Sequence, residues 1–139
     1  MQPEQLKFAK THEWLHLDPA TKTATVGLSA FALEALTDLV YVELPKVGAK
    51  VSPGQSFGEI ESVKAVSDIY SPVSGEVVDT FPVPNDPKDP KAAEKRMLQI
   101  KSDPYGEGWL VKIKLADEAG LDELLSYGDY QKQCAEEQH

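Results

Sequence analysis

The stretch that decides the fold is Gly58-Glu59-Ile60-Glu61-Ser62-Val63-Lys64-Ala65-Val66-Ser67-Asp68-Ile69-Tyr70-Ser71-Pro72-Val73-Ser74-Gly75. Two strand-like segments, 56–61 and 66–70, flank Val63-Lys64-Ala65. If these segments pair as a hairpin, Lys64 lies at its tip, where connecting residues face water. We therefore expect an exposed amine that another protein can reach and acylate. Because exposed lysines are common on protein surfaces, the segment around Lys64 has to supply the specificity.

Short strand-like runs recur on both sides of this stretch and are separated by Gly and Pro. They are 7–10, 23–26, 39–44, 75–78 and 109–115. In the last run Trp109, Val111, Ile113 and Leu115 are expected to point one way, with Lys112 and Lys114 between Leu110 and Ala116 on the other face. The pattern predicts a mainly β fold: a small β-sandwich or barrel-sandwich hybrid of two related antiparallel sheets, with one short internal helix and a C-terminal helix.

The internal helix is expected to begin after Ser29, a good N-cap residue. Its apolar stripe is predicted to be Phe31, Ala32, Ala35 and Leu36. Residues 82–104 are rich in proline and predict a surface loop.

The C-terminal helical segment is expected over about 116–139. Its apolar face is predicted to be Leu121, Leu124 and Leu125. Gly128 is expected to interrupt it and to leave a separate short helix over 130–137.

Composition excludes several classes of function for these 139 residues. The 23 acidic and 14 basic residues give a net charge of −9, which argues against nucleic-acid binding. No apolar run approaches the ~20 residues that span a bilayer, and the N-terminus does not resemble a signal peptide. We expect no membrane association, and a location in the bacterial cytoplasm or, for a processed eukaryotic chain, in the mitochondrial matrix.

Cysteine and histidine usage narrows the chemistry. The single cysteine, Cys134, excludes a disulfide or a CxxC site within the chain. Its acidic neighbours Glu136 and Glu137 are expected to raise the pKa of the thiol and lower its reactivity. The three histidines, His12, His16 and His139, lack a metal-site spacing with acids or cysteine. His12 and His16 are four apart, but Asp18-Pro19 and the strand-like neighbours argue against a helix there, so we expect no metal.

The segment around Lys64 resembles the lipoyl attachment site of the H proteins of the glycine cleavage system. The matching residues are Glu61-Ser62-Val63-Lys64-Ala65, then Ser67-Asp68, then Ser71-Pro72-Val73-Ser74-Gly75-Glu76-Val77. Biotin carriers typically have Met on both sides of their lysine, and lipoyl domains of 2-oxoacid dehydrogenases usually have Asp-Lys-Ala. Val63 and Ala65 therefore favour the H-type carrier.

Three further signatures carry the resemblance from about residue 7 to 133. They are Thr11-His12-Glu13-Trp14, then Val40-Tyr41-Val42-Glu43-Leu44-Pro45 with Gly48, and Asp103-Pro104-Tyr105-Gly106-Glu107-Gly108-Trp109. The chain departs from the family at Thr37, Phe81 and Lys101 and in the longer, more basic stretch 82–99. These departures bear on partner docking rather than on Lys64.

The resemblance implies a single lipoyl-carrier domain over residues 1–139 that is not itself a catalyst. Lipoate would form an amide with Lys64, within the attachment motif Glu61, Ser62, Val63 and Ala65. Glu13 and Asp68, with Thr11 and Leu28, would line a cleft for the loaded arm.

The implied partners are the PLP-dependent glycine decarboxylase (P protein), the aminomethyltransferase (T protein), dihydrolipoyl dehydrogenase (L protein) and lipoate-attaching enzymes. We expect a monomer.

Three other readings stay open. An H-like lipoyl carrier could serve lipoate relay or a sulfur-oxidising disulfide-reductase-like system, as the changes at Phe81 and Lys101 suggest. A stand-alone enzyme would need a nucleophile–base pair or metal cluster, which the sequence does not offer. The last is an interaction module with an unmodified Lys64.

Overall fold

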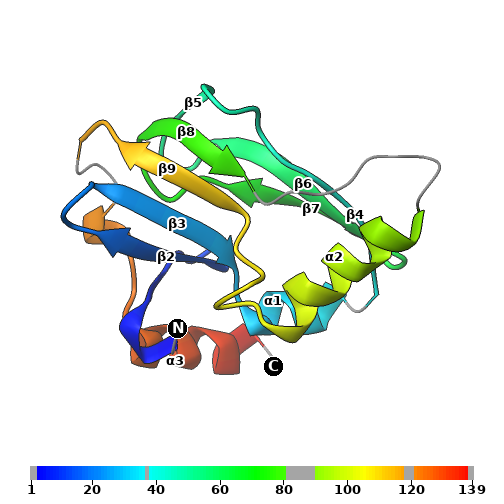
Figure 1. The fold of residues 1–139 in the computed structure, drawn as a ribbon. Helices are drawn as coiled ribbons and strands as arrows, with labels where there is room; N and C mark the ends of the chain where they lie inside the picture. The colour runs from blue at the N-terminus through cyan, green and yellow to red at the C-terminus, as the bar shows by residue number, and fades with distance from the viewer. Residues whose placement is uncertain (1–2, 37, 81–89, 118–120, 138–139) are drawn as a thin grey trace.

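The computed structural model describes residues 3–36, 38–80, 90–117 and 121–137. Within these residues the strands form a six-stranded sheet, order β1-β2-β3-β9-β8-β5, and a three-stranded sheet, order β4-β6-β7 (Figure 1). Every strand pair is antiparallel. The predicted fold class, mainly β with two antiparallel sheets, is confirmed.

The larger sheet consists of β1 (Lys7–Phe8), β2 (Glu13–Asp18), β3 (Thr23–Leu28), β9 (Val111–Leu115), β8 (Gly75–Thr80) and β5 (Lys50–Val51). The smaller sheet consists of β4 (Leu39–Glu43), β6 (Ser56–Ser62) and β7 (Val66–Tyr70). The helices are η1 (Pro3–Gln5), α1 (Ala30–Leu36), α2 (Pro90–Ser102), η2 (Leu121–Glu123) and α3 (Tyr127–Glu137).

The main core lies between the sheets and contains residues of every described strand except β1, whose Phe8 packs in a second cluster. In β9 the alternation follows the prediction, since Val111 and Ile113 are fully buried while Lys112 and Lys114 lie on the other face. Ile60 of β6 and Ile69 of β7 enter the same core from the smaller sheet. Val42 of β4 does the same, and the opposite face of the smaller sheet carries exposed residues such as Glu43, Glu59 and Asp68.

Helix α1 begins as predicted, but it buries a different stripe. The Ser29 hydroxyl accepts a hydrogen bond from the amide of Ala32 at 3.2 Å, which is the N-cap interaction. Its buried residues are Leu33 and Leu36, three apart, whereas Ala35 is exposed. The larger leucine side chains bury more apolar area than Ala35 could, so they determine the helix orientation.

Helix α2 corrects the prediction that residues 82–104 form a loop. Its residues are mostly good helix formers, and Pro90 stands at the first position, where proline is tolerated. Met97 and Ile100 are buried in the main core. The proline count hid this helix, because no proline lies in its interior: Pro90 is its first residue and the others precede or follow it. Thr37, Phe81 and the rest of 81–89 lie outside the described residues.

Helix α3 corrects the predicted break at Gly128, which instead lies inside the first turn. First-turn amides have no intrahelical acceptor, so glycine costs less there than in mid-helix. The helix packs through a second core cluster of Leu6, Phe8, Trp14 and Tyr130. The rings of Phe8 and Tyr130 stack with centroids 4.5 Å apart. Figure 1 shows α3 beneath β2, beside the N-terminal segment.

Among the described residues, no helix is long and apolar enough to cross a membrane.

Candidate functional site

Lys64 lies at the apex of the hairpin formed by β6 and β7. The strands pair from Ser56 and Tyr70 up to Glu61 and Val66, which leaves the residues between them as the connection. Lys64 is exposed, and its neighbour Val63 is 76% exposed. The predicted hairpin is confirmed, and the Lys64 amine lies where a partner protein can reach it.

The Ser62 hydroxyl fixes the backbone beneath Lys64. It accepts hydrogen bonds from the amides of Lys64 at 3.2 Å and Ala65 at 3.0 Å, and it donates to the carbonyl of Ala65 at 3.1 Å. Ser62 is 5% exposed, so water competes little with these bonds. The amide of Val63 donates to the carbonyl of Asp38 at 3.0 Å. The apex is therefore ordered by its own four residues and one neighbouring loop.

The outward face of the smaller sheet is acidic beneath the apex. Glu43, Glu59 and Asp68 occupy one row across β4, β6 and β7, and all three are exposed. Like charges that face each other across strands are unfavourable, so this row does not stabilise the sheet.

Glu13 is a buried carboxylate at the start of β2, with 1% of its surface exposed. Its Oε2 accepts a hydrogen bond from the amide of Tyr70 at 3.4 Å, and its Oε1 accepts one from the Thr11 hydroxyl. Glu13 thus joins the start of β2 to the end of β7. The same contacts bring Thr11 and Tyr70 together.

Burial determines the protonation of Glu13. Loss of hydration raises its pKa from 4.5 to about 7, although the hydrogen bonds from Thr11 and Tyr70 act in the opposite direction. Near neutral pH this group therefore exists both as an acid and as a carboxylate. The protonated form can donate a hydrogen bond, and the ionised form can accept one from a cationic amine.

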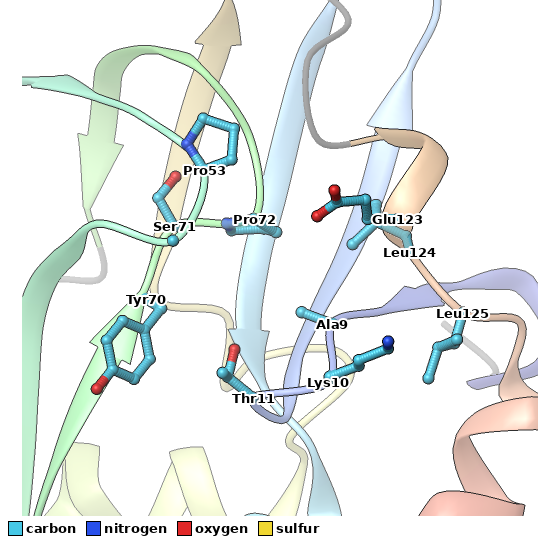
Figure 2. Close-up of a pocket in the computed structure, with 11 residues that line it drawn as sticks. Ala9, Lys10, Thr11, Pro53, Tyr70, Ser71, Pro72, Glu123, Leu124 and Leu125 are labelled. Carbon is cyan, nitrogen blue, oxygen red and sulfur yellow. The ribbon is translucent and has the colours of Figure 1, made fainter.

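A pocket of about 540 Å³ opens beside Thr11 and Tyr70 (Figure 2). Its lining residues are Ala9, Lys10, Thr11, Pro53, Gly54, Tyr70, Ser71, Pro72, Glu123, Leu124 and Leu125. They come from the loop before β2, the turn after β5, the end of β7 and the segment around η2. The pocket therefore depends on four separate parts of the chain.

The predicted cleft residues are not all in this pocket. Thr11 lines it, and Glu13 lies directly behind Thr11 and Tyr70. Asp68 is exposed on the outer face of β7 and accepts a hydrogen bond from the Tyr70 hydroxyl at 3.4 Å. Leu28 is 4% exposed in the main core and pairs with Glu13 across β2 and β3.

Sequence reasoning missed Tyr70, which links the predicted acids. Its amide contacts Glu13 and its hydroxyl contacts Asp68. The signal was available, because Val66, Asp68 and Tyr70 alternate along β7 and so share one face. Glu123 and Pro53 had no comparable signal, because only the tertiary fold brings them to the pocket.

The remaining candidates give no second site. Burial, more than the charge of Glu137, raises the pKa of the Cys134 thiol, so the predicted direction holds with a different main cause. Among the residues whose structure is described, no group of three or more His, Cys, Asp or Glu side chains could hold a metal ion.

Comparison with known proteins agrees with these features. The family model for the glycine cleavage H-protein matches residues 6–137. The "Glycine cleavage system H protein" of Carboxydothermus hydrogenoformans is 44% identical over 97% of this chain and 95% of its own length. That of Rhodopirellula baltica is 46% identical over 96% of both chains.

A solved structure shares the fold as well. The crystal structure of a glycine cleavage system H protein from Mycobacterium marinum is 35% identical and superposes with a TM-score of 0.78, covering 96% of this chain and 99% of the other. The chain belongs to the glycine cleavage H-protein family.

Proposed function

We propose that this protein is a lipoylated carrier of the glycine cleavage system, with lipoate attached through an amide to Lys64 and residues 1–139 acting as one carrier domain. The observation that carries the proposal is the exposed Lys64 at the apex of an ordered hairpin in a member of this family. When bound, the lipoyl group would supply a disulfide that accepts the aminomethyl group derived from glycine.

The hairpin suits a lysine that several enzymes must reach. The Ser62 bonds hold the backbone of Lys64, while its side chain extends into solvent without needing to be pulled out of the fold. An attaching enzyme then binds a preformed turn and orders few residues. The flanking residues Glu61, Val63 and Ala65 are exposed, so the attaching enzyme would contact them together with the lysine.

Reach along β7 links the apex to the predicted cleft. A lysine with a lipoyl group extends about 14 Å. Asp68 is four residues from Lys64, or about 13 Å along a strand, and Tyr70 is about 20 Å away. The arm could therefore lie along the face that carries Val66, Asp68 and Tyr70, with its end beside Asp68 and the Tyr70 hydroxyl that bonds to it.

The acids would stabilise a cationic amine at the end of the arm. Asp68 offers an exposed carboxylate, and Glu13 offers a buried one that Thr11 and Tyr70 orient. A charged amine near Glu13 would favour its ionised form. Leu28, buried beside Glu13, would act only by packing behind it.

The protein would carry no catalytic residue of its own. Its partners would be the P, T and L proteins and the lipoate-attaching enzymes, each working on the same arm in turn. A tethered group gives each docked enzyme a local concentration of order mM, which avoids diffusion of a labile group.

The decisive experiment is the intact mass of the protein from its native host, followed by sequencing of the peptide that contains Lys64. We expect one lipoyl group, on Lys64. An unmodified Lys64, or lipoate on another lysine, would contradict the proposal.

An exchange assay separates the proposal from the other lipoyl roles. The fully lipoylated protein should support exchange of bicarbonate with the glycine carboxyl group in the presence of the decarboxylase. Full lipoylation without exchange would favour a carrier for lipoate relay or for a disulfide-reductase-like system.

A further inference from the structure

The loop between β1 and β2 contains an unusual backbone conformation at His12. Ala9 and Glu13 close the loop through a bond from the Ala9 amide to the Glu13 carbonyl, and the His12 amide donates to the Ala9 carbonyl. This is a three-residue hairpin loop whose last residue must be left-handed, a position that favours glycine. His12 occupies it with φ 81°. A β-carbon is disfavoured there, so the side chain must have a compensating role.

The His12 ring is held on both nitrogens by helix α3. Nδ1 lies 2.6 Å from the Tyr130 hydroxyl, and Nε2 lies 3.0 Å from Oε2 of Glu137. The ring also stacks on Phe31 of α1, with centroids 5.3 Å apart. A side chain fixed at three points holds the backbone that bears it.

These contacts form a continuous hydrogen-bonded chain. The Tyr130 hydroxyl lies 2.5 Å from the Ser29 hydroxyl, which accepts from the amide of Ala32. All donors and acceptors are matched if Ser29 donates to Tyr130, Tyr130 to His12 Nδ1, and His12 Nε2 to Glu137. Ser29 and Tyr130 are 0% and 2% exposed, so water competes little for the bond between them, whereas the bond between His12 and Glu137 lies at the surface.

Helix α3 contacts the loop at another point as well. The Gln133 side chain donates to the carbonyl of Lys10 at 2.8 Å. Tyr130, Gln133 and Glu137 are spaced by three and four residues, so they share one face of α3. That face is turned toward the loop 10–12, and we call these three residues the brace.

We propose that His12 is a positioning residue through which the brace holds Thr11 at the wall of the pocket and Glu13 behind it. Thr11 and Glu13 are its immediate neighbours in the chain, and a hydrogen bond from the Thr11 hydroxyl to the Glu13 carboxylate joins them. The pocket beside Thr11 therefore takes its shape from the C-terminal helix. The link between brace and loop stands without lipoylation, whereas its effect on the loaded arm rests on the proposed function.

The first test uses the unmodified protein. Tyr130→Phe keeps the ring on Phe8 but removes the hydroxyl, and His12→Gly keeps the left-handed backbone but removes the ring. In both we expect the Tyr70 amide, which donates to Glu13, to exchange its proton about tenfold faster. The pKa of the Glu13 carboxyl, measured by ¹³C-detected titration, should also fall from about 7 toward 4.5, because water reaches the carboxyl and reduces its desolvation.

Matched controls separate positioning from general stability. Glu137→Gln should give a smaller change of the same sign, whereas Glu136→Gln removes the same charge one residue away and should change neither readout. Asparagine tolerates the left-handed conformation and keeps a polar atom near the position of Nδ1. In His12→Asn, the Tyr70 exchange rate and the Glu13 pKa should therefore lie between those of the parent and those of His12→Gly.

The proposal is overturned if the Glu13 pKa and the Tyr70 amide exchange rate in His12→Gly equal those in Glu136→Gln. Should Tyr130→Phe not fold, His12→Gly and Glu137→Gln still decide the matter. In the lipoylated protein, His12→Gly should shorten the lifetime of the aminomethyl-loaded form severalfold with no change in lipoylation. An absence of lipoylation in the parent protein would contradict the proposed function while leaving the first test intact.

Discussion

The two turns nearest the candidate site are ordered in opposite ways. The apex around Lys64 is held by hydrogen bonds from the amides of Lys64 and Ala65 to the Ser62 hydroxyl, two or three residues away. The loop before Glu13 is held by Tyr130, which lies 118 residues from His12 in the sequence. The first turn presents a side chain to solvent, and the second positions a buried carboxylate. Local bonds suffice for presentation, whereas a buried charged group needs support from the tertiary fold.

The largest expected effect concerns the turn that presents Lys64. Lys64→Arg should abolish lipoylation completely, because arginine keeps the charge but cannot be acylated. Stability should stay within about 0.5 kcal/mol of the parent, since Lys64 is exposed. Intact mass and urea denaturation measure the two quantities. Lys46→Arg, on another exposed lysine, is the control and should be lipoylated normally.

The next effect concerns the positioned carboxylate and depends on pH. The folded pKa of Glu13, about 7, lies above its ordinary value of 4.5, so the folded protein binds more protons than the unfolded chain between these values. Stability contributed by this group is complete below pH 4.5 and is lost as the pH rises through 7.

Glu13→Gln removes this dependence. At pH 8 we expect the variant to be more stable than the parent by about 3 kcal/mol, and at pH 4 nearly equal to it. Urea denaturation at both pH values measures the difference. A variant less stable than the parent at pH 8 would show that the ionised carboxylate is well stabilised in the fold. Asp68→Asn is the control: it keeps Glu13 and should therefore still lose stability as the pH rises through 7.

A smaller effect is expected from the hydroxyl beneath Lys64. Ser62→Ala leaves the amides of Lys64 and Ala65 without their acceptor, at a cost of about 1–2 kcal/mol. The rate of lipoylation should fall, because the attaching enzyme then binds a less ordered turn. Ser67→Ala, one strand away, is the control. Unchanged lipoylation in Ser62→Ala would mean that the enzyme orders the apex itself.

The smallest effect sharpens the contrast between the two acids. Asp68→Asn should leave lipoylation intact and shorten the lifetime of the aminomethyl-loaded form by about threefold, because an exposed carboxylate interacts weakly with a cation in water. The loaded form is followed by release of its amine over time. A lifetime equal to that of the parent would remove Asp68 from the cleft.

The sequence predicted what local rules decide. The hairpin of β6 and β7, the cap at Ser29 and the alternation of β9 follow from turn residues, capping and periodicity, and all three are present. Helix α2 was missed because proline content outweighed the helix formers after Pro90. The break at Gly128 was wrong because the helix begins one residue earlier.

The candidate site divides in the same way. Lys64 could be placed from its neighbours alone. Glu13 was singled out by a motif, but its burial and its contacts with Thr11 and Tyr70 could not be inferred, because they join β2 to β7. The role of His12 was out of reach for the same reason, since nothing near it in the sequence indicates Tyr130 or Glu137.

The position of α3 in the chain sets an order of assembly during synthesis. All residues of the hairpin bearing Lys64 have been synthesised by residue 70, and the side-chain bonds at its apex come from Ser62 alone. Tyr130, Gln133 and Glu137 follow some sixty residues later, so a nascent or truncated chain would offer its lysine before the loop beside Glu13 is secured. If attachment enzymes acted on such a chain, the modified lysine would be present before the loop 10–12 is held by α3.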